Sequence, residues 1–152
     1  MSMIKPLTST LLVLSLAACG GGGGDSDTFS WDTMTVTDGS TVTSVSMVSD
    51  ATLDTANPTA YQVDIDSASG SATTALFSFS FDPTNSNQLT SLYVMVGTAE
   101  YNCGNATDCA PTGATVTVDA ANRVIRVQGL TLPGINSTTG TTVIDSRLRW
   151  VL

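Results

Sequence analysis

The sequence predicts an all-β domain, an antiparallel β-sandwich of about eight or nine strands, immunoglobulin-like in general build. A small β-barrel is the alternative, because alternation of residues does not separate the two. Three observations carry this prediction. Ser, Thr, Val, Ala and Gly dominate the chain after residue 28, a mixture that favours strands over helices. Short alternating stretches follow one another between turn-forming residues, and no helical periodicity exceeds about two turns.

The first predicted elements are a hairpin and a single strand. Residues 31–48, WDTMTVTDGSTVTSVSMV, alternate on both sides of Asp38-Gly39, a dipeptide typical of tight hairpin turns. Residues 60–66, AYQVDID, alternate apolar and polar side chains, which indicates a strand with one buried face.

The middle of the chain predicts two more strands. Residues 75–81, ALFSFSF, place three phenylalanines on one face, and Asp82-Pro83 begins a turn. Residues 89–97, LTSLYVMVG, are nearly continuously apolar from Leu92 to Val96. We therefore expect this strand to be covered on both faces, near the centre of the fold.

The last predicted elements are a second hairpin and a terminal strand. Residues 114–132, ATVTVDAANRVIRVQGLTL, form two alternating stretches around a turn at 119–122. In residues 141–152, TTVIDSRLRWVL, one face carries Ile144, Leu148 and Trp150. We expect this strand to be integral to the core, with its two arginines on the opposite face beside carboxylates.

Residues 1–18 have the parts of an export signal. Lys5 supplies a positive charge, Leu7 to Leu16 are apolar apart from small hydroxyl residues, and two alanines follow. The run is shorter than the about 20 apolar residues that a membrane-spanning helix needs. We therefore expect this segment to direct export and to be removed.

The motif Leu16-Ala17-Ala18-Cys19 resembles the lipobox of bacterial lipoproteins. That resemblance covers only the signal region, and the alternative is an ordinary signal peptide with a chance cysteine. It implies a diacylglycerol on Cys19, cleavage before it and acylation of the new amino terminus. In such lipoproteins of enteric bacteria, Asp after the cysteine causes retention at the inner membrane. Gly20 stands at that position, so the resemblance implies a lipid anchor in the bacterial outer membrane, on its periplasmic or its surface side.

The sequence thus divides into three parts. Residues 1–18 are the lipoprotein signal peptide, and residues 19–28 are the lipidated cysteine with a Gly-rich tether. Five consecutive glycines give that tether maximal backbone freedom. Residues 29–152 are a single β-sandwich domain, long enough for one core. The globular domain itself resembles no family.

The charge of the chain limits its partners. Its formal net charge is −8, and removal of the signal peptide with Lys5 leaves four arginines against thirteen acids. All four arginines lie in the last thirty residues. Nucleic acid and anionic lipid headgroups both require clustered positive charge, so this composition disfavours them as partners.

Cys103 and Cys109 remain as a pair after Cys19 is assigned to lipid. The segment between them, GNATD, is turn-forming, and an exported protein meets oxidising conditions. A redox-active pair prefers two intervening residues, and a zinc site requires further ligands in a chain without histidine. We therefore predict a structural disulfide.

The residues that usually perform catalysis or bind metals are scarce. The mature chain has no histidine or lysine and one glutamate, Glu100, so we predict that the protein is not an enzyme and needs no cofactor. Asp64, Asp66 and Gly70 share part of the pattern of a calcium loop. Strand alternation also places both aspartates on one face, so calcium binding stays open.

Five aromatic residues are candidates for a sugar-stacking face: Trp31, Tyr61, Tyr93, Tyr101 and Trp150. Because large aromatics are more often buried, we expect only Tyr101, near the cysteine pair, to be exposed. The sequence therefore predicts a non-enzymatic envelope lipoprotein whose β module serves protein interaction or a structural surface role. The alternative is a glycan-binding or adhesive module, which would show two or more coplanar exposed aromatics.

Overall fold

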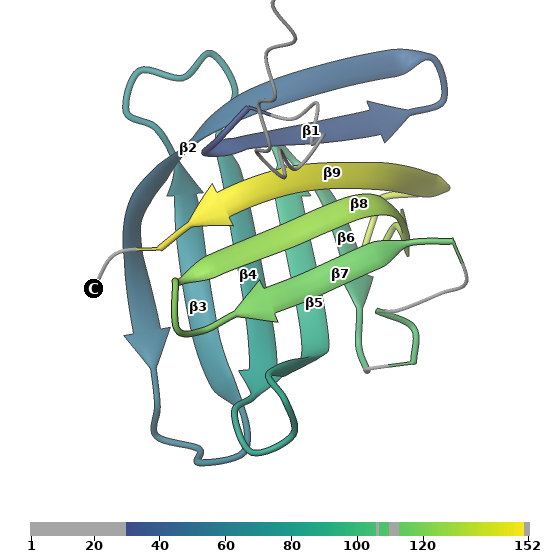
Figure 1. The fold of residues 1–152 in the computed structure, drawn as a ribbon. Coiled ribbons are helices and arrows are strands. Elements are labelled where there is room, and N and C mark those ends of the chain that lie inside the picture. The colour runs from purple at the N-terminus through teal and green to yellow at the C-terminus, as the bar shows by residue number, and fades with distance from the viewer. Residues whose placement is uncertain (1–29, 106, 110–112, 151–152) are drawn as a thin grey trace, which may run out of the picture.

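The computed structural model describes residues 30–105, 107–109 and 113–150, which form nine strands and no helix (Figure 1). The strands are β1 (Thr33–Asp38), β2 (Thr41–Asp54), β3 (Tyr61–Ser67), β4 (Ala75–Asp82), β5 (Gln88–Val96), β6 (Ala99–Cys103), β7 (Thr115–Asp119), β8 (Val124–Pro133) and β9 (Thr141–Arg149). All paired strands are antiparallel. The predicted fold class and the number of strands are confirmed.

The strands form one sheet in the order β6-β5-β4-β3-β2-β1-β9-β8-β7. Neighbours in the chain are neighbours in the sheet, except that β6 and β7 lie at its two edges. The first strand pairs with the last one, and Thr33 of β1 lies opposite Arg147 of β9. This pairing brings the start of the domain beside its end.

The sheet folds over at β2 into two layers. β2 has 14 residues and pairs with β1 along its first part and with β3 along its second. The register shifts between Met47 and Ala51, and an irregularity of this kind bends a strand. β1, β9, β8 and β7 form the front layer of Figure 1, and β3 to β6 form the back layer, with strands that run crosswise to the front ones.

The core lies between the two layers. The three phenylalanines of β4 are buried there, as their alternation predicts. Trp150 is 3 % exposed and packs edge-on against Phe79, with ring centroids 5.3 Å apart. The front layer contributes Met34, Val36, Ile125, Val127, Leu130, Leu132, Ile144 and Leu148. The end of the last strand is therefore part of the core, as the sequence predicts.

Both predicted hairpins are confirmed. In the first, Asp38 pairs with Thr41 and encloses Gly39, whose φ of 58° favours glycine. In the second, Val116 lies opposite Val127 across β7 and β8.

The prediction for β5 is wrong in one respect. Leu92 and Val94 are buried, but Tyr93 and Met95 on the other face are only half-buried. The fold has two layers, so each strand keeps one outward face. Tyr and Met tolerate partial exposure, which explains why a continuous apolar run occurs in a strand covered on one side.

The segment after β8 closes one end of the gap between the sheet edges. Ile135 N donates to the carbonyl oxygen of Glu100 in β6 at 2.9 Å, and Glu100 N donates to Thr138 Oγ1 at 2.9 Å. The Asn136 side-chain amide donates to the Glu100 carboxylate. A Cβ at Gly134 would lie 2.6 Å from the Thr138 carbonyl oxygen, so this tight loop requires glycine. The backbone and the carboxylate of Glu100 thus attach this segment to the β6 edge of the sheet.

Candidate functional site

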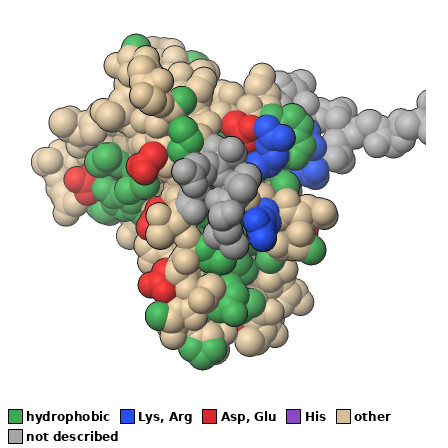
Figure 2. Space-filling view, turned by 90° about the vertical axis from the view of Figure 1, so that its left-hand side faces the viewer, with side chains coloured by type: hydrophobic (Ala, Val, Ile, Leu, Met, Phe, Trp, Pro, Cys, Tyr) green, Lys and Arg blue, Asp and Glu red, His purple; other side chains and the backbone are tan. Residues whose placement is uncertain are grey.

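The four arginines of the domain gather at one end of the front layer. They come from the turn before β8 (Arg123), from β8 (Arg126) and from the outer face of β9 (Arg147 and Arg149). Trp31 joins them because β1 pairs with β9. We call these five residues the Arg–Trp face. In Figure 2 the blue side chains lie in one region of the view, with one acidic side chain directly beside them, and further acidic side chains are scattered elsewhere.

Trp31 is held at the surface by stacking. It is 41 % exposed, and the guanidinium carbon of Arg147 lies 3.6 Å from its ring centroid. The guanidinium carbon of Arg149 lies 5.2 Å from the same ring. A guanidinium over an indole contributes about 0.5–1 kcal/mol at an exposed site. The stack therefore orients the ring while leaving part of it accessible.

Asp32 fixes Arg149. Nε of Arg149 donates to the two carboxylate oxygens at 3.2 and 3.1 Å, its Nη2 also donates, and its backbone N donates at 3.2 Å. Burial of Asp32 disfavours its charged form, but the hydrogen bonds and the charge of Arg149 together outweigh burial and lower its pKa. The same contact raises the pKa of Arg149. The predicted carboxylate beside the arginines of this strand is confirmed for Arg149.

A hollow of about 280 Å³ opens beside the stack. Its lining consists of Trp31, Thr117, Asp119, Asn122, Val124, Arg126 and Arg147. The Asn122 side-chain amide and backbone N donate to the Asp119 carboxylate at 2.8 and 3.0 Å and lower its pKa, so the carboxylate stays charged. The hollow offers two guanidinium groups, hydrogen-bonding groups and apolar surface, which suit a small anionic or polar group.

The outer face of the back layer has different chemistry. Asp64 and Asp66 lie on the same face of β3, as alternation predicts. Asp64 accepts hydrogen bonds from Ser78 Oγ at 2.5 Å and from Gln62 Nε2 at 3.1 Å. In the described ranges no group of three or more His, Cys, Asp or Glu could hold a metal ion. The described residues thus add no cluster of ligands around Asp64 and Asp66, and calcium binding stays a prediction.

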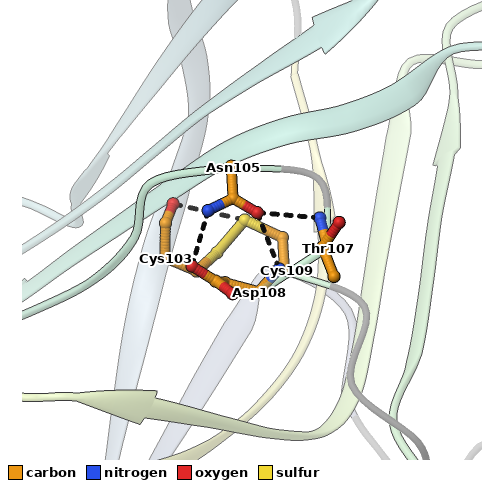
Figure 3. The surroundings of a disulfide bond; sticks show 5 residues. All are labelled: Cys103, Asn105, Thr107, Asp108 and Cys109. Atoms are coloured by element: carbon orange, nitrogen blue, oxygen red, sulfur yellow. Dashed lines mark hydrogen bonds between the residues drawn. A yellow bond between two sulfur atoms is a disulfide. The ribbon is translucent and has the colours of Figure 1, made fainter.

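The disulfide between Cys103 and Cys109 is present, with an S–S distance of 2.06 Å and Cα atoms 5.2 Å apart (Figure 3). Asn105 organises the loop: its Oδ1 accepts from the backbone N atoms of Thr107 and Asp108, both at 3.0 Å. Both cysteines are buried, so the bridge attaches the loop to the core. A hollow of about 430 Å³ lies between this loop and β8, and Asp108 is the one charged residue in its lining.

The prediction for the aromatic residues is wrong in two places. Tyr101 was expected to be exposed, but it points inward from β6 and is buried, and burial raises its pKa. Trp31 is the exposed ring instead. Alternation alone does not place Trp31, because this residue lies in the turn before β1 and Asp32 has a φ of 55°. Trp150 is buried, and Tyr61 and Tyr93 are half-buried.

Cys19, the predicted lipidation site, lies outside the described residues, as do the signal peptide and the tether. Within the described ranges, no helix has the length and hydrophobicity needed to cross a membrane. No protein family, curated protein or solved structure matches the chain.

Proposed function

We propose that the protein is a non-enzymatic lipoprotein of the bacterial outer membrane, held by lipid at Cys19, with a β domain for protein interaction or a structural surface role. The motif at residues 16–19 and the glycine tether support the anchor. A folded domain with a buried disulfide suits a module that stands outside the cell's reducing compartments.

The observation that carries a recognition role is the gathering of arginines around one exposed tryptophan: Arg147 and Arg149 lie over the Trp31 ring, and Arg126 lines the hollow beside it. Tryptophan and arginine are the residue types that contribute most to binding surfaces. The aspartates, in contrast, are used singly in turns and strand contacts: Asp82 binds Thr84, and Asp119 binds Asn122. This distribution favours a contact surface over a reaction centre.

The glycan-binding alternative has weaker support. It calls for two or more coplanar exposed aromatics, and in the described residues Trp31 is the only exposed large aromatic ring. One side of that ring is covered by Arg147. A neutral sugar would therefore find a smaller stacking surface than this alternative requires.

Metabolic labelling with a clickable palmitate analogue tests the anchor. We expect label in the outer-membrane fraction for the parent protein and none for Cys19→Ser. The matched control is the pair Cys103→Ser and Cys109→Ser, which changes two cysteines and keeps the label. Unlabelled parent protein, or label that survives Cys19→Ser, would overturn the proposal.

A further inference from the structure

We propose that the Arg–Trp face docks on the anionic surface of the membrane that holds Cys19, and so fixes the orientation of the domain. This inference rests on the proposed lipid anchor. Composition argued against anionic headgroups because four arginines in an acidic chain do not by themselves form a cluster. The pairing of β9 with β1 and β8 does form one.

The position of the face in the chain favours contact with the membrane. Trp31 follows Cys19 by 12 residues. A random coil of this length and Gly-rich composition would have a root-mean-square span of roughly 17–21 Å. A domain of this size has a radius of gyration of about 14 Å and therefore a diameter of about 36 Å, which exceeds that root-mean-square span. The end of the domain that carries Trp31 therefore stays nearest to the lipid.

The distribution of charge favours docking through the same end of the domain. Between residue 30 and Arg123 the chain has no lysine or arginine, and its acids are spread over both layers. An anionic surface repels those parts within a Debye length, about 8 Å at physiological salt. At the Arg–Trp face four arginines outnumber Asp32 and Asp119, so this is the end of the described domain that such a surface attracts.

The chemistry of the face suits a lipid headgroup. Trp is favoured at the membrane–water interface, where its ring lies at headgroup level. Arg126 and Arg147 lie directly opposite each other on neighbouring strands and line the hollow beside Trp31. A phosphate between two guanidinium groups accepts charge-assisted hydrogen bonds from both. Asp119 in the same lining limits the site to a headgroup of small net charge or one with hydroxyl groups.

The test uses the lipidated full-length product reconstituted in vesicles, after mass spectrometry of its amino terminus. The vesicles contain phosphatidylcholine alone or mixed with phosphatidylglycerol, with lipids brominated near the headgroup. The protein has two tryptophans, and Trp150 is buried. We expect quenching of Trp31 that rises with phosphatidylglycerol and falls with salt. A Trp31→Phe variant supplies the signal of Trp150, which we expect to be unquenched.

Substitution of arginines tests whether the Arg–Trp face itself causes the docking. An arginine near an anionic surface contributes about a factor of five in binding, so Arg123→Asn with Arg149→Gln lowers the ratio of docked to undocked domain about 25-fold. Arg123→Asn alone, at an exposed turn residue with φ 55°, lowers it about fivefold and keeps the fold. The matched control, Thr55→Glu with Thr98→Glu, lowers net charge equally at exposed positions outside the face and keeps docking.

Several outcomes overturn the inference. Trp31 quenching that is absent, or equal in both kinds of vesicle, shows that the face does not bind anionic lipid and leaves a protein partner as its occupant. An equal loss for the arginine variants and the glutamate control shows that net charge alone acts. An amino terminus without lipid overturns the anchor, which is a separate result from unquenched Trp31 in a protein that carries lipid.

Discussion

The outer faces of the two layers follow the same strand alternation, yet they differ in charge. The front layer carries the Arg–Trp face, with four arginines and an exposed tryptophan. The back layer presents Asp64, Asp66 and Glu100 with serines and glutamine, and no arginine or lysine occurs in β3 to β6. Alternation decides which side chains face outward, but strand pairing decides which of them meet. The contrast in charge therefore arises from pairing between residues more than a hundred positions apart.

The largest expected effect comes from the core, which lies beneath both outer faces. Trp150→Ala removes a buried indole that packs against Phe79 and Phe81, and we expect a loss of about 3–5 kcal/mol in the free energy of unfolding. That is a large part of the about 5–15 kcal/mol of an ordinary domain. Denaturant unfolding measures it. Trp31→Ala is the control, with a loss of about 1 kcal/mol or less because its ring is exposed. Similar losses for the two variants would contradict the contrast.

The disulfide offers a second test of the comparison, because it lies at the end of β6 in the back layer. Cys103→Ser with Cys109→Ser opens a loop of seven residues, and chain entropy predicts a loss of about 2.4 kcal/mol. We expect the Arg–Trp face to keep its membrane docking in this variant, because the loop lies at the gap between β6 and β7. Thermal unfolding with and without reductant measures the effect. A parent protein whose melting temperature does not change on reduction would contradict it.

The ion pair of the Arg–Trp face predicts a pH effect. The pKa of Asp32 is lower in the folded domain than the about 3.9 of an unfolded chain. Its contribution is therefore complete above that value and is lost as the pH falls through the folded pKa. We expect Asp32→Asn to lose about 0.5–1 kcal/mol at neutral pH, a modest value because half of the Arg149 side chain is exposed.

Unfolding experiments from neutral pH to below pH 3 measure this effect, with the difference between parent and Asp32→Asn shrinking at the acid end. Arg149→Gln and the double variant complete a cycle. Effects of the two substitutions that simply add would show that Asp32 and Arg149 are not coupled.

The smallest expected effect concerns Ser146, on the inner face of β9. It is buried opposite Met34 and Val127, and its Oγ has no hydrogen-bond partner in the described part of the chain. Ser146→Ala removes an unsatisfied hydroxyl, so we expect unchanged stability or a gain of up to about 1 kcal/mol. The matched control is Thr142→Val, also buried, whose Oγ1 donates to the Thr37 carbonyl oxygen at 2.9 Å. There we expect a loss of about 1 kcal/mol. A clear loss for Ser146→Ala would indicate that its hydroxyl has a partner.

Local patterns of the sequence were sufficient for eight of the nine strands, for both hairpins and for the disulfide, but not for β6. Alternation placed the phenylalanines of β4 and Trp150 in the core because each strand has one buried face. Tyr101 was missed because β6 has only five residues, too few for alternation to outweigh its place beside a loop. The Arg–Trp face was missed because the sequence does not state that β1 pairs with β9. Residues that depend on such distant pairing become neighbours only in the fold.

Hydrogen–deuterium exchange of the lipidated protein tests the contrast between the two faces most directly. Exchange is compared in vesicles that contain phosphatidylglycerol and in vesicles of phosphatidylcholine alone. We predict that added phosphatidylglycerol slows exchange at residues 30–33 and in the turn at 119–123, and leaves the turns and loops of the back layer unchanged. Slower exchange in the back layer, or no change at residues 30–33, would contradict the assignment of the Arg–Trp face as the surface that meets the membrane.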